Sequence, residues 1–252
     1  MIAPTSPRLA VVTGTSSGVG LAATRILLER GWTVCGIARR PGPVPHDRYQ
    51  HLTLDLSDVA GLDRTIADRL APLFSDPRWT RVGLVNNAAV ATLLGPVGRF
   101  SGEDLAANYA VNLVAPVALM GAAGRLVPPT TPLTVVNVSS GAAGHPFPGM
   151  AAYCSGKAAL RMAGMVAAEE WKSTAPHAPT RTGSAVVCYE PGVVDTPMQT
   201  YARGHSEAEF PWVAPFKEFE ARSIAVPPAQ PATQIADLLD RTDLPPFTEA
   251  RL

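Results

Sequence analysis

The chain has 252 residues, in which 21 Lys and Arg balance 21 Asp and Glu, and 46% of the residues are hydrophobic. Balanced charge without a long charged run argues against capture by nucleic acid or an anionic membrane, and we expect a small-molecule partner. Three widely spaced cysteines suit buried thiols in a reducing compartment, and the five histidines lack metal-ligand spacing. We therefore expect a cytoplasmic protein without a signal peptide, a membrane span or a metal.

Short apolar runs rich in β-branched residues alternate along the chain with helical patterns. The runs predict strands at 9–13, 33–38, 51–56, 82–87, 133–140 and 184–190, and the helical patterns cover 19–30, about 58–74, about 103–126 and 150–171. This alternation predicts an α/β fold: a single Rossmann-type domain over residues 1–252, with a doubly wound parallel sheet and helices on both faces. Ligands of such sheets bind beyond the carboxyl ends of the strands, so functional residues should follow strands.

The first predicted strand runs into the glycine-rich segment TGTSSGVG at 13–20. Glycines at positions 14, 18 and 20 would let the backbone approach a pyrophosphate, and the N-terminus of the next helix offers free N–H donors. An ordinary glycine-rich turn is the alternative, because glycine motifs alone are weak signals. The position between the first strand and the first helix favours a dinucleotide site.

The second predicted strand ends in GIARR, where a dinucleotide site contacts the adenosine ribose. An acidic residue there would accept a hydrogen bond from the 2′-hydroxyl of NAD, but Ala38 is followed by Arg39 and Arg40. Guanidinium groups bind a 2′-phosphate by charge-assisted hydrogen bonds, so this position favours NADP. The alternative is a pair of surface arginines beside a loop.

Residues 151–160, AAYCSGKAAL, place Tyr153 and Lys157 four positions apart, about one helical turn. A neighbouring ammonium favours the phenolate, which would lower the pKa of Tyr153 and suit it to protonate a developing alkoxide. The alternative is a tyrosine packed at an interface and a solvated lysine.

Six signals in order resemble the classical short-chain dehydrogenases/reductases: TGTSSGVG, NNAA at 86–89, Asn112 in YAVNLVAP, Ser140, Tyr153 with Lys157, and PGVVDT at 191–196. The resemblance spans residue 8 to about residue 200. It implies that Tyr153 is the general acid and that Lys157 lowers the pKa of Tyr153 and binds the nicotinamide ribose. It also implies that Ser140 bonds the substrate carbonyl and that Asn112 holds a water of a proton relay.

The resemblance further implies NADPH/NADP as cofactor and a set of contacting residues spread over the loops that follow the strands. The implied cofactor contacts are Gly14, Ser16, Ser17, Gly18, Val19, Gly20, Arg39, Asp55, Leu56, Asn87, Ala88, Tyr153, Lys157, Pro191, Gly192, Val193 and Thr196. Asn86 resembles a structural asparagine that fastens the central sheet. For Asp55 the alternative is a cap on the helix that begins near Ser57.

Three positions depart from the family pattern. Ser17 stands where many NADP-preferring relatives carry a basic residue, so phosphate recognition must depend on Arg39 with help from Ser16 or Ser17. Ala89 replaces the last glycine of the family's NNAG. Pro245–Pro246 falls where relatives place a seventh strand, which we therefore expect to be short or at the edge of the sheet.

Within the family, PGVVDTPMQTYAR and VNNAAVATLLGPVG are most similar to the sepiapterin reductase and benzil reductase branch. That similarity implies NADPH-dependent reduction of an aromatic or α-dicarbonyl ketone, with a substrate loop at about 196–229 that carries short helices. The expected apolar pocket walls are Leu93, Leu94, Phe147, Met150, Met198, Tyr201 and Trp212. Each of these residues could instead be ordinary core.

Two other functions stay open. One is an NAD(P)-dependent alcohol or steroid dehydrogenase of the same family, and the other is a nucleotide-binding regulator without catalysis. The helices at about 103–126 and 150–171 have small apolar faces that could pack against a second copy, as they do in relatives, so we expect a homodimer or homotetramer. The alternative is that both helices simply cover the sheet.

Overall fold

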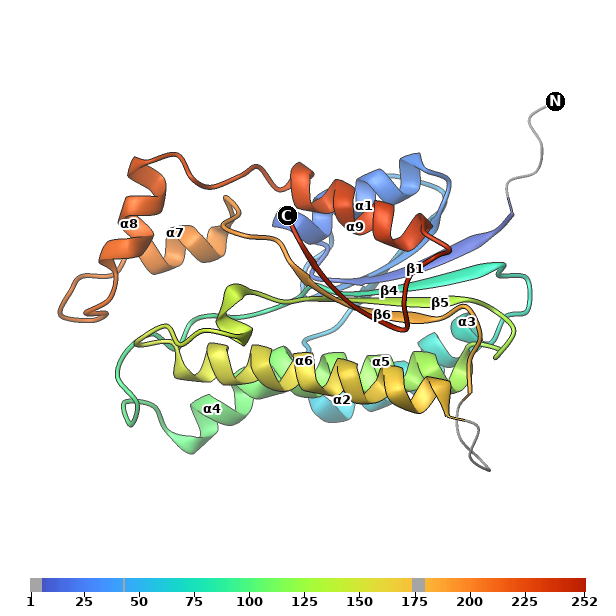
Figure 1. Ribbon diagram of the computed structural model, residues 1–252, viewed down its shortest axis with the longest axis horizontal. Coiled ribbons are helices and arrows are strands. Elements are labelled where there is room, and N and C mark those ends of the chain that lie inside the picture. Colours follow the sequence, from blue (N-terminus) through green and yellow to red (C-terminus); the bar gives the residue numbers. More distant parts are fainter. Residues whose placement is uncertain (1–5, 43, 174–179) are drawn as a thin grey trace.

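The computed structural model describes residues 6–42, 44–173 and 180–252. Within these residues the chain forms a seven-stranded parallel sheet of order β3-β2-β1-β4-β5-β6-β7, which confirms the predicted fold class (Figure 1). The strands are β1 Arg8–Thr13, β2 Thr33–Ala38, β3 Tyr49–Thr53, β4 Arg81–Asn86, β5 Leu133–Val138, β6 Ala185–Glu190 and β7 Phe247–Arg251. The strand order reverses between β1 and β4, so a ligand crevice is expected at their carboxyl ends.

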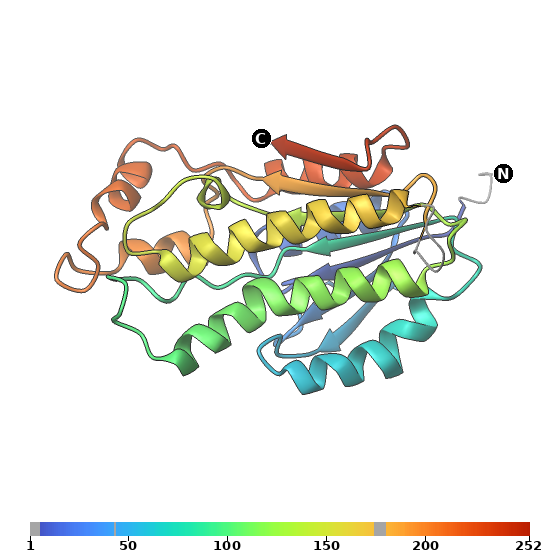
Figure 2. The same ribbon diagram turned by 60° about the horizontal axis from the view of Figure 1, so that its bottom comes forward.

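Helices cover both faces of the sheet. Helices α1 and α9 lie on one face, and α2 to α6 lie on the other (Figures 1 and 2). The helices are α1 Gly18–Glu29, α2 Val59–Thr65, α3 Ala71–Phe74, α4 Gly102–Tyr109, α5 Ala115–Leu126, α6 Ala151–Lys172, α7 Pro197–Arg203, α8 Ala214–Ala221 and α9 Ala229–Asp240. Strand side chains alternate between the two apolar cores, because successive residues point to opposite faces.

Two predicted helices each contain a π-helical turn. The turn Ile66–Leu70 joins α2 to α3, and the turn Ala110–Val114 joins α4 to α5. Each turn is followed within two residues by a proline, Pro72 or Pro116. Proline has no N–H to donate to the carbonyl four residues earlier, so the widened turn lets the helix continue past that missing bond.

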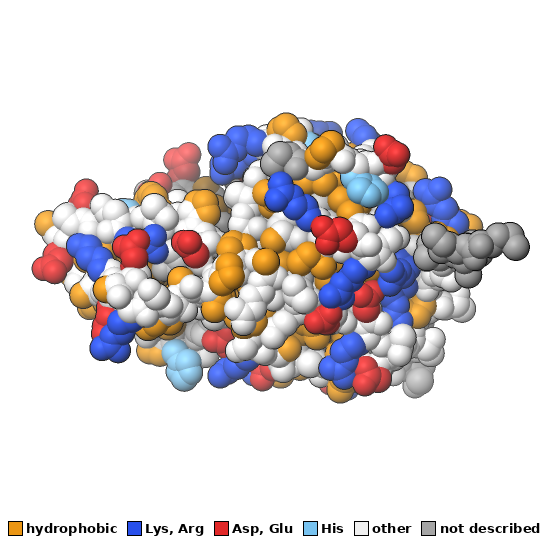
Figure 3. Space-filling view, turned by 90° about the horizontal axis from the view of Figure 1, so that it is seen from above, with side chains coloured by type: hydrophobic (Ala, Val, Ile, Leu, Met, Phe, Trp, Pro, Cys, Tyr) orange, Lys and Arg blue, Asp and Glu red, His pale blue; other side chains and the backbone are white. Residues whose placement is uncertain are grey.

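The continuous helix Gly102–Leu126 is long and apolar enough to cross a membrane by length and composition. However, 44% of its most apolar stretch is buried inside the protein. Leu119 and Met120 pack into the core beneath the sheet, as expected for a core helix. Over the face formed by α1 and α9, basic and acidic side chains are interspersed, in keeping with the balanced charge (Figure 3).

The largest differences from the sequence-based expectation lie in the third strand and the C-terminal quarter. The third strand covers Tyr49–Thr53 and not 51–56, because Asp55 turns the chain by accepting hydrogen bonds from the main-chain N–H and the hydroxyl of Ser57 at 3.0 and 2.8 Å. Helix α9 was not predicted. Strand β7 begins directly after Pro246 and is a short edge strand, as the two prolines suggested.

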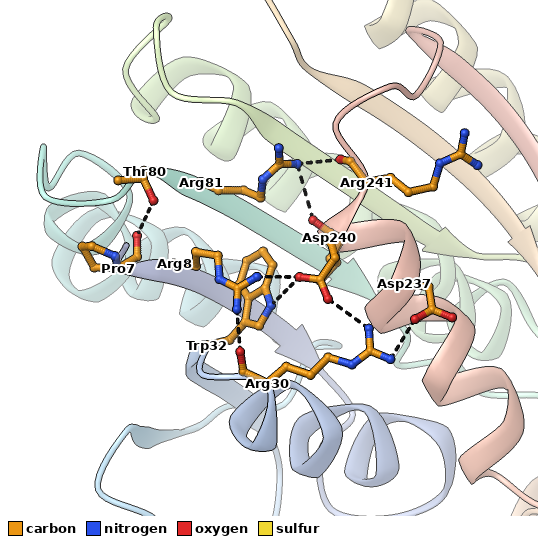
Figure 4. Close-up of polar contacts among 10 residues, drawn as sticks. Pro7, Arg8, Arg30, Trp32, Thr80, Arg81, Asp237, Asp240 and Arg241 are labelled. Carbon is orange, nitrogen blue, oxygen red and sulfur yellow. Dashed lines mark hydrogen bonds and ion pairs between the residues drawn. The ribbon is translucent and has the colours of Figure 1, made fainter. Parts of the chain in front are cut away.

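A polar cluster ties the end of α9 to the amino-terminal ends of the strands (Figure 4). Asp240 accepts hydrogen bonds from Arg8 at 2.6 Å, Arg30 at 2.9 Å and the indole of Trp32 at 3.1 Å. Arg30 also pairs with Asp237 at 2.7 Å. The cluster lies at the opposite end of the sheet from the ligand crevice, so its role is to dock α9 on α1 and β1.

Candidate active site

The glycine-rich segment forms a tight turn between β1 and α1. Gly14 and Gly18 have positive φ values of +76° and +57°. A Cβ atom added to Gly20 would lie 2.4 Å from the main-chain oxygen of Gly14 and 2.5 Å from Nδ2 of Asn87, distances that real Cβ atoms do not adopt. Only glycine therefore lets α1 start this close to the turn, which is the cradle that a pyrophosphate requires.

No side chain of α1 caps or neutralises its own N-terminus. Ser17 is the N-cap residue, but its side chain makes no capping hydrogen bond, and the first turn has no acidic residue. The free N–H groups and the partial positive charge there fit a dinucleotide phosphate. Val19 is buried beneath the turn in the core under α1, and Ser16 is half-buried beside it.

The loop after β4 is fastened to the glycine turn. The hydroxyl of Thr13 accepts hydrogen bonds from the main-chain N–H groups of Asn87 and Ala88 at 3.0 and 2.9 Å, and Asn87 Nδ2 donates to the main-chain oxygen of Thr13 at 2.9 Å. Asn86 is buried and donates to Asn137 at 2.9 Å, which joins β4 to β5. The structure thus places Asn86 in the structural position that the sequence suggested.

Arg39 and Asp55 lie side by side where β2 and β3 end. Arg39 Nη1 is 3.9 Å from Asp55 Oδ2, and 69% of the Arg39 side chain is exposed, so its guanidinium is accessible to a phosphate. Hydrogen bonds from Ser57 lower the pKa of Asp55. The N-cap of α2 is Asp58, whose side chain accepts a hydrogen bond from the main-chain N–H of Gly61 at 2.9 Å. Asp55 therefore forms the turn that precedes this cap. Leu56, between them, is buried.

Ser140, Tyr153 and Lys157 are brought together by β5 and α6. Ser140 follows β5 and caps a short 3₁₀ turn, Gly141–Ala143, by accepting from Ala142 N at 3.2 Å. Lys157 is 3% exposed, donates to the main-chain oxygen of Val138 at 2.6 Å, and holds its Nζ 5.6 Å from the centre of the Tyr153 ring. Tyr153 and Lys157 therefore share one face of α6, and this face meets the end of β5.

Burial sets the charge states of this group. It raises the pKa of Tyr153 to about 12, although a hydrogen bond with Ser140 opposes the rise. The direction is opposite to the expected lowering of this pKa, because removing the phenolate from water outweighs its partners. Burial also lowers the pKa of Lys157 to about 8. At neutral pH the phenol is therefore protonated and most of the lysine is charged.

Asn112 lies in the π-helical turn and is 1% exposed. Its amide makes a two-point contact with Val90: Oδ1 accepts from the main-chain N–H at 2.9 Å, and Nδ2 donates to the main-chain oxygen at 2.7 Å. The side chain is thus occupied in holding the loop after β4. Because Pro116 lacks an N–H, the main-chain oxygen of Asn112 cannot accept the helical hydrogen bond from four residues later.

The segment 191–196 follows β6 and turns back toward the glycine loop. Gly192 has a φ of +68°, and the main chain of Val193 accepts from Val226 N at 2.9 Å. Thr196 is the N-cap residue of α7, and its Cγ2 lies 3.3 Å from the position of a Cβ on Gly18. Pro191 is buried. The segment therefore connects the cofactor loop to the helices that follow.

Helices α7 and α8 and the loop between them form a lid with its own apolar cluster. The members of this lid cluster are Ala91, Leu94, Met150, Ala202, Phe210 and Val213, with Tyr153, Cys154, Met198 and Phe216 packed against them. A Cβ on Gly149, whose φ is +79°, would lie 2.6 Å from Phe210 and 2.7 Å from Trp212. The absence of a side chain at Gly149 therefore lets the lid settle on the loop after β5.

The expected substrate walls fall into two groups. Leu94 and Met150 are buried within the lid cluster, and Met198 packs against it, whereas Leu93 is half-buried. The remaining three, Phe147, Tyr201 and Trp212, expose 42%, 44% and 38% of their surfaces. Sequence reasoning missed Gly149 and Phe210, because a contact between the loop after β5 and the lid leaves no local pattern in the sequence.

An open hollow of about 760 Å³ lies along α7. It is lined by Asp195, Thr196, Pro197, Thr200, Tyr201, Gly204, His205 and Glu209. Tyr201 donates to the main-chain oxygen of Thr92 at 3.3 Å, so the hollow adjoins the loop after β4. Among the residues that the structure describes, no group of three or more His, Cys, Asp or Glu side chains is placed to hold a metal ion.

Comparison with known proteins agrees with this geometry. The sequence model of the short chain dehydrogenase family matches residues 8–207. The chain is 30% identical to the benzil reductase ((S)-benzoin forming) of Bacillus subtilis over 92% of this chain and 93% of that protein. It is 34% identical to the sepiapterin reductase of Meriones unguiculatus over 77% of this chain and 76% of that protein.

Solved structures share the fold. A short-chain dehydrogenase/reductase from Burkholderia vietnamiensis is 31% identical, with a TM-score of 0.67 over 77% of this chain and 87% of that chain. A short chain dehydrogenase/reductase from Saccharomyces cerevisiae is 24% identical and has a TM-score of 0.79 over 97% of this chain and 95% of that chain. The second likeness supports the fold alone.

Proposed function

Because this chain belongs to the short chain dehydrogenase family, we propose that it is an NADPH-dependent carbonyl reductase acting on aromatic or α-dicarbonyl ketones. The observation that carries the proposal is the group formed by Ser140, Tyr153 and Lys157 at the carboxyl end of the sheet, beside the glycine cradle and under the lid. NADPH, when bound, would supply a hydride to the carbonyl carbon. The remaining chemistry is the work of these three side chains.

Tyr153 would donate its proton to the carbonyl oxygen. A pKa of about 12 keeps the phenol protonated across the neutral range, so its proton is available, although a phenol with this pKa is a weaker acid than one whose pKa lies near the working pH. The Ser140 hydroxyl would hydrogen-bond the same oxygen and hold the carbonyl in line. The product is the corresponding alcohol, an α-hydroxy ketone when the substrate is a diketone.

Lys157 would stabilise the phenolate that remains after proton transfer. Its ammonium has three donors, of which one is bound to the main-chain oxygen of Val138, so others can reach the phenolate and a ribose hydroxyl. The proton would return through Lys157 and a water held at the main chain of Asn112. The two hydrogen bonds between the Asn112 side chain and Val90 would fix the main-chain oxygen of Asn112 relative to the loop after β4.

The preference for NADPH rests on the end of β2. The second strand ends at Ala38 without a carboxylate, and Arg39 follows it with an exposed guanidinium. The hydroxyl of Ser17, which makes no capping hydrogen bond, is exposed on the glycine turn between β1 and α1. Together they offer a charge-assisted site for a 2′-phosphate.

The test is the rate of nicotinamide absorbance loss with benzil, with NADPH and NADH compared at equal concentrations. We expect turnover with NADPH and little with NADH. Tyr153→Phe should reduce kcat by about 10²–10⁴-fold while NADPH still binds. The matched control is Tyr109→Phe, which removes a hydroxyl bonded to Ser155 at 2.8 Å on the neighbouring helix and should leave kcat within a few-fold.

The other outcomes select the alternatives. Faster turnover with NADH that is insensitive to Arg39→Ala would replace the cofactor assignment with that of an NAD-dependent alcohol or steroid dehydrogenase. Tight NADPH binding without turnover on a broad carbonyl panel would favour a nucleotide-binding regulator. Full activity in Tyr153→Phe would reject the assigned acid.

A further inference from the structure

Thr15 follows Gly14 in the glycine turn, but its side chain is completely buried. Its hydroxyl oxygen lies 3.2 Å from the phenol oxygen of Tyr49, within hydrogen-bond distance. Tyr49 begins β3, the edge strand next to β2, so this bond ties the edge of the sheet to the turn that would hold the pyrophosphate. Burial raises the pKa of Tyr49, so its phenol is neutral and its hydroxyl can donate one hydrogen bond and accept another.

The second bond of Tyr49 is made with His51 on the same strand. Nδ1 of His51 lies 3.2 Å from the phenol oxygen, so Thr15, Tyr49 and His51 form a chain of two hydrogen bonds. The phenol has a single proton and therefore donates to one neighbour while it accepts from the other. His51 thus orients the hydroxyl that Tyr49 presents to Thr15.

Strand β2 leaves room for this contact because it carries Gly36 opposite His51. A Cβ atom on Gly36 would lie 2.4 Å from the phenol oxygen of Tyr49 and 2.8 Å from the hydroxyl oxygen of Thr15. Both distances are shorter than those that real Cβ atoms adopt. Glycine at this position therefore lets the two side chains meet over the strand.

The loop after β2 closes on the same threonine. A Cβ atom on Gly42 would lie 2.6 Å from the main-chain oxygen of Thr15 and 3.5 Å from Cα of Ser16, so the main chain of this loop is pressed against the glycine turn. Arg39 begins the loop, and Ser16 belongs to the turn. The two segments that would flank a 2′-phosphate are thus held together around Thr15.

We infer that Tyr49, oriented by His51, is a positioning residue for the 2′-phosphate site of the cofactor. Tyr49 fixes Thr15 and thereby sets the separation between the glycine turn and the loop that carries Arg39. The inference rests on the proposed NADPH dependence and deepens it. NADH has no 2′-phosphate and does not depend on this separation, so loss of the Tyr49 hydroxyl should weaken the binding of NADPH more than that of NADH.

The test measures the Kd values of NADPH and NADH by titration calorimetry on the full chain, without a ketone. Tyr49→Phe keeps the ring over Gly36 and removes the hydroxyl. We expect it to raise the Kd of NADPH about fivefold to tenfold, the size of one hydrogen bond, and to change the Kd of NADH less than about twofold.

Variants of Thr15 examine the other end of the same bond. Thr15→Val keeps the shape of the side chain without the hydroxyl, so it should shift the ratio of the two Kd values as Tyr49→Phe does. Thr15→Ser keeps the hydroxyl and should preserve the wild-type ratio. The double variant Thr15→Val/Tyr49→Phe should shift the ratio no more than the larger single effect, because both substitutions remove one shared bond.

The control is Tyr109→Phe, which removes a hydroxyl bonded to Ser155 on the other face of the sheet and should leave the ratio unchanged. Because the readout is a ratio, a general loss of stability that affects both cofactors equally cancels. An unchanged ratio in Tyr49→Phe or Thr15→Val, or an equal shift in the control, would overturn the inference while the NADPH preference stands. Wild-type protein that binds NADPH no more tightly than NADH would reject the proposed cofactor preference and this inference with it.

Discussion

Buried Lys157 should make the free energy of unfolding depend on pH, and the substitution Lys157→Met should remove this dependence. Its pKa is lowered from 10.5 to about 8 by burial, so between these two values the unfolded chain binds the proton more tightly than the folded chain does. The free energy of unfolding should therefore rise as the pH rises from about 8 to 10.5. A pKa shift of this size corresponds to a change of about 3 kcal/mol in the free energy of unfolding.

Lys157→Met removes the buried ammonium and keeps a long unbranched side chain. The main-chain oxygen of Val138 loses its donor, which costs about 1–3 kcal/mol at every pH. The pH trend is therefore the diagnostic quantity. Relative to wild type, the variant should be least disadvantaged at pH 7 and should lose about 3 kcal/mol of relative stability by pH 10.5, since only wild type gains on deprotonation.

The assay is urea unfolding at several pH values between 7 and 10.5 for wild type, Lys157→Met and Lys172→Met. Lys172 lies on the same helix with its side chain 46% exposed, so it controls for the loss of a lysine without the loss of a buried charge. Other titrating groups are common to all three chains and cancel in the differences, apart from Cys188, whose pKa is lowered by the charge of Lys157 and therefore changes in Lys157→Met. The reasoning is refuted if Lys157→Met and Lys172→Met follow the same pH trend.

Two further substitutions separate cofactor geometry from fold stability. Gly20→Ala places a Cβ 2.4 Å from a main-chain oxygen, so it should weaken NADPH binding at least about tenfold and lower stability. Gly121→Ala meets no atom within 4 Å and should stabilise α5 by about 0.5–1 kcal/mol. If calorimetry and thermal melts showed equal effects of the two substitutions on NADPH binding and on stability, the role of Gly20 in the phosphate cradle would be contradicted. Asp240→Ala should lower stability by about 2 kcal/mol and Tm by about 4–8 °C without changing kcat/KM, because three hydrogen bonds far from the crevice are lost. An unchanged melt, or an equal loss in the exposed Asp243→Ala, would show that this polar cluster does not hold α9.

The sequence by itself determined the fold class, the approximate positions of the first six strands along the chain, and the proximity of Tyr153 to Lys157. These features rest on local pattern: continuous apolar runs mark strands buried on both faces, and the four-residue step from Tyr153 to Lys157 needs only one helical turn. The same locality explains why the glycine turn was recognised. Its strain and close contacts involve residues that are few positions apart or that follow a neighbouring strand.

Tertiary structure alone decided the rest. It reversed the expected direction of the Tyr153 pKa, because desolvation depends on the packing around a side chain and not on its neighbours in the chain. It also brought the Asn112 side chain into hydrogen bonds with the main chain of Val90, which lies 22 residues away in the sequence. It also placed Asp195 and Glu209 in one hollow and seated the lid on Gly149, contacts between loops that no periodicity encodes.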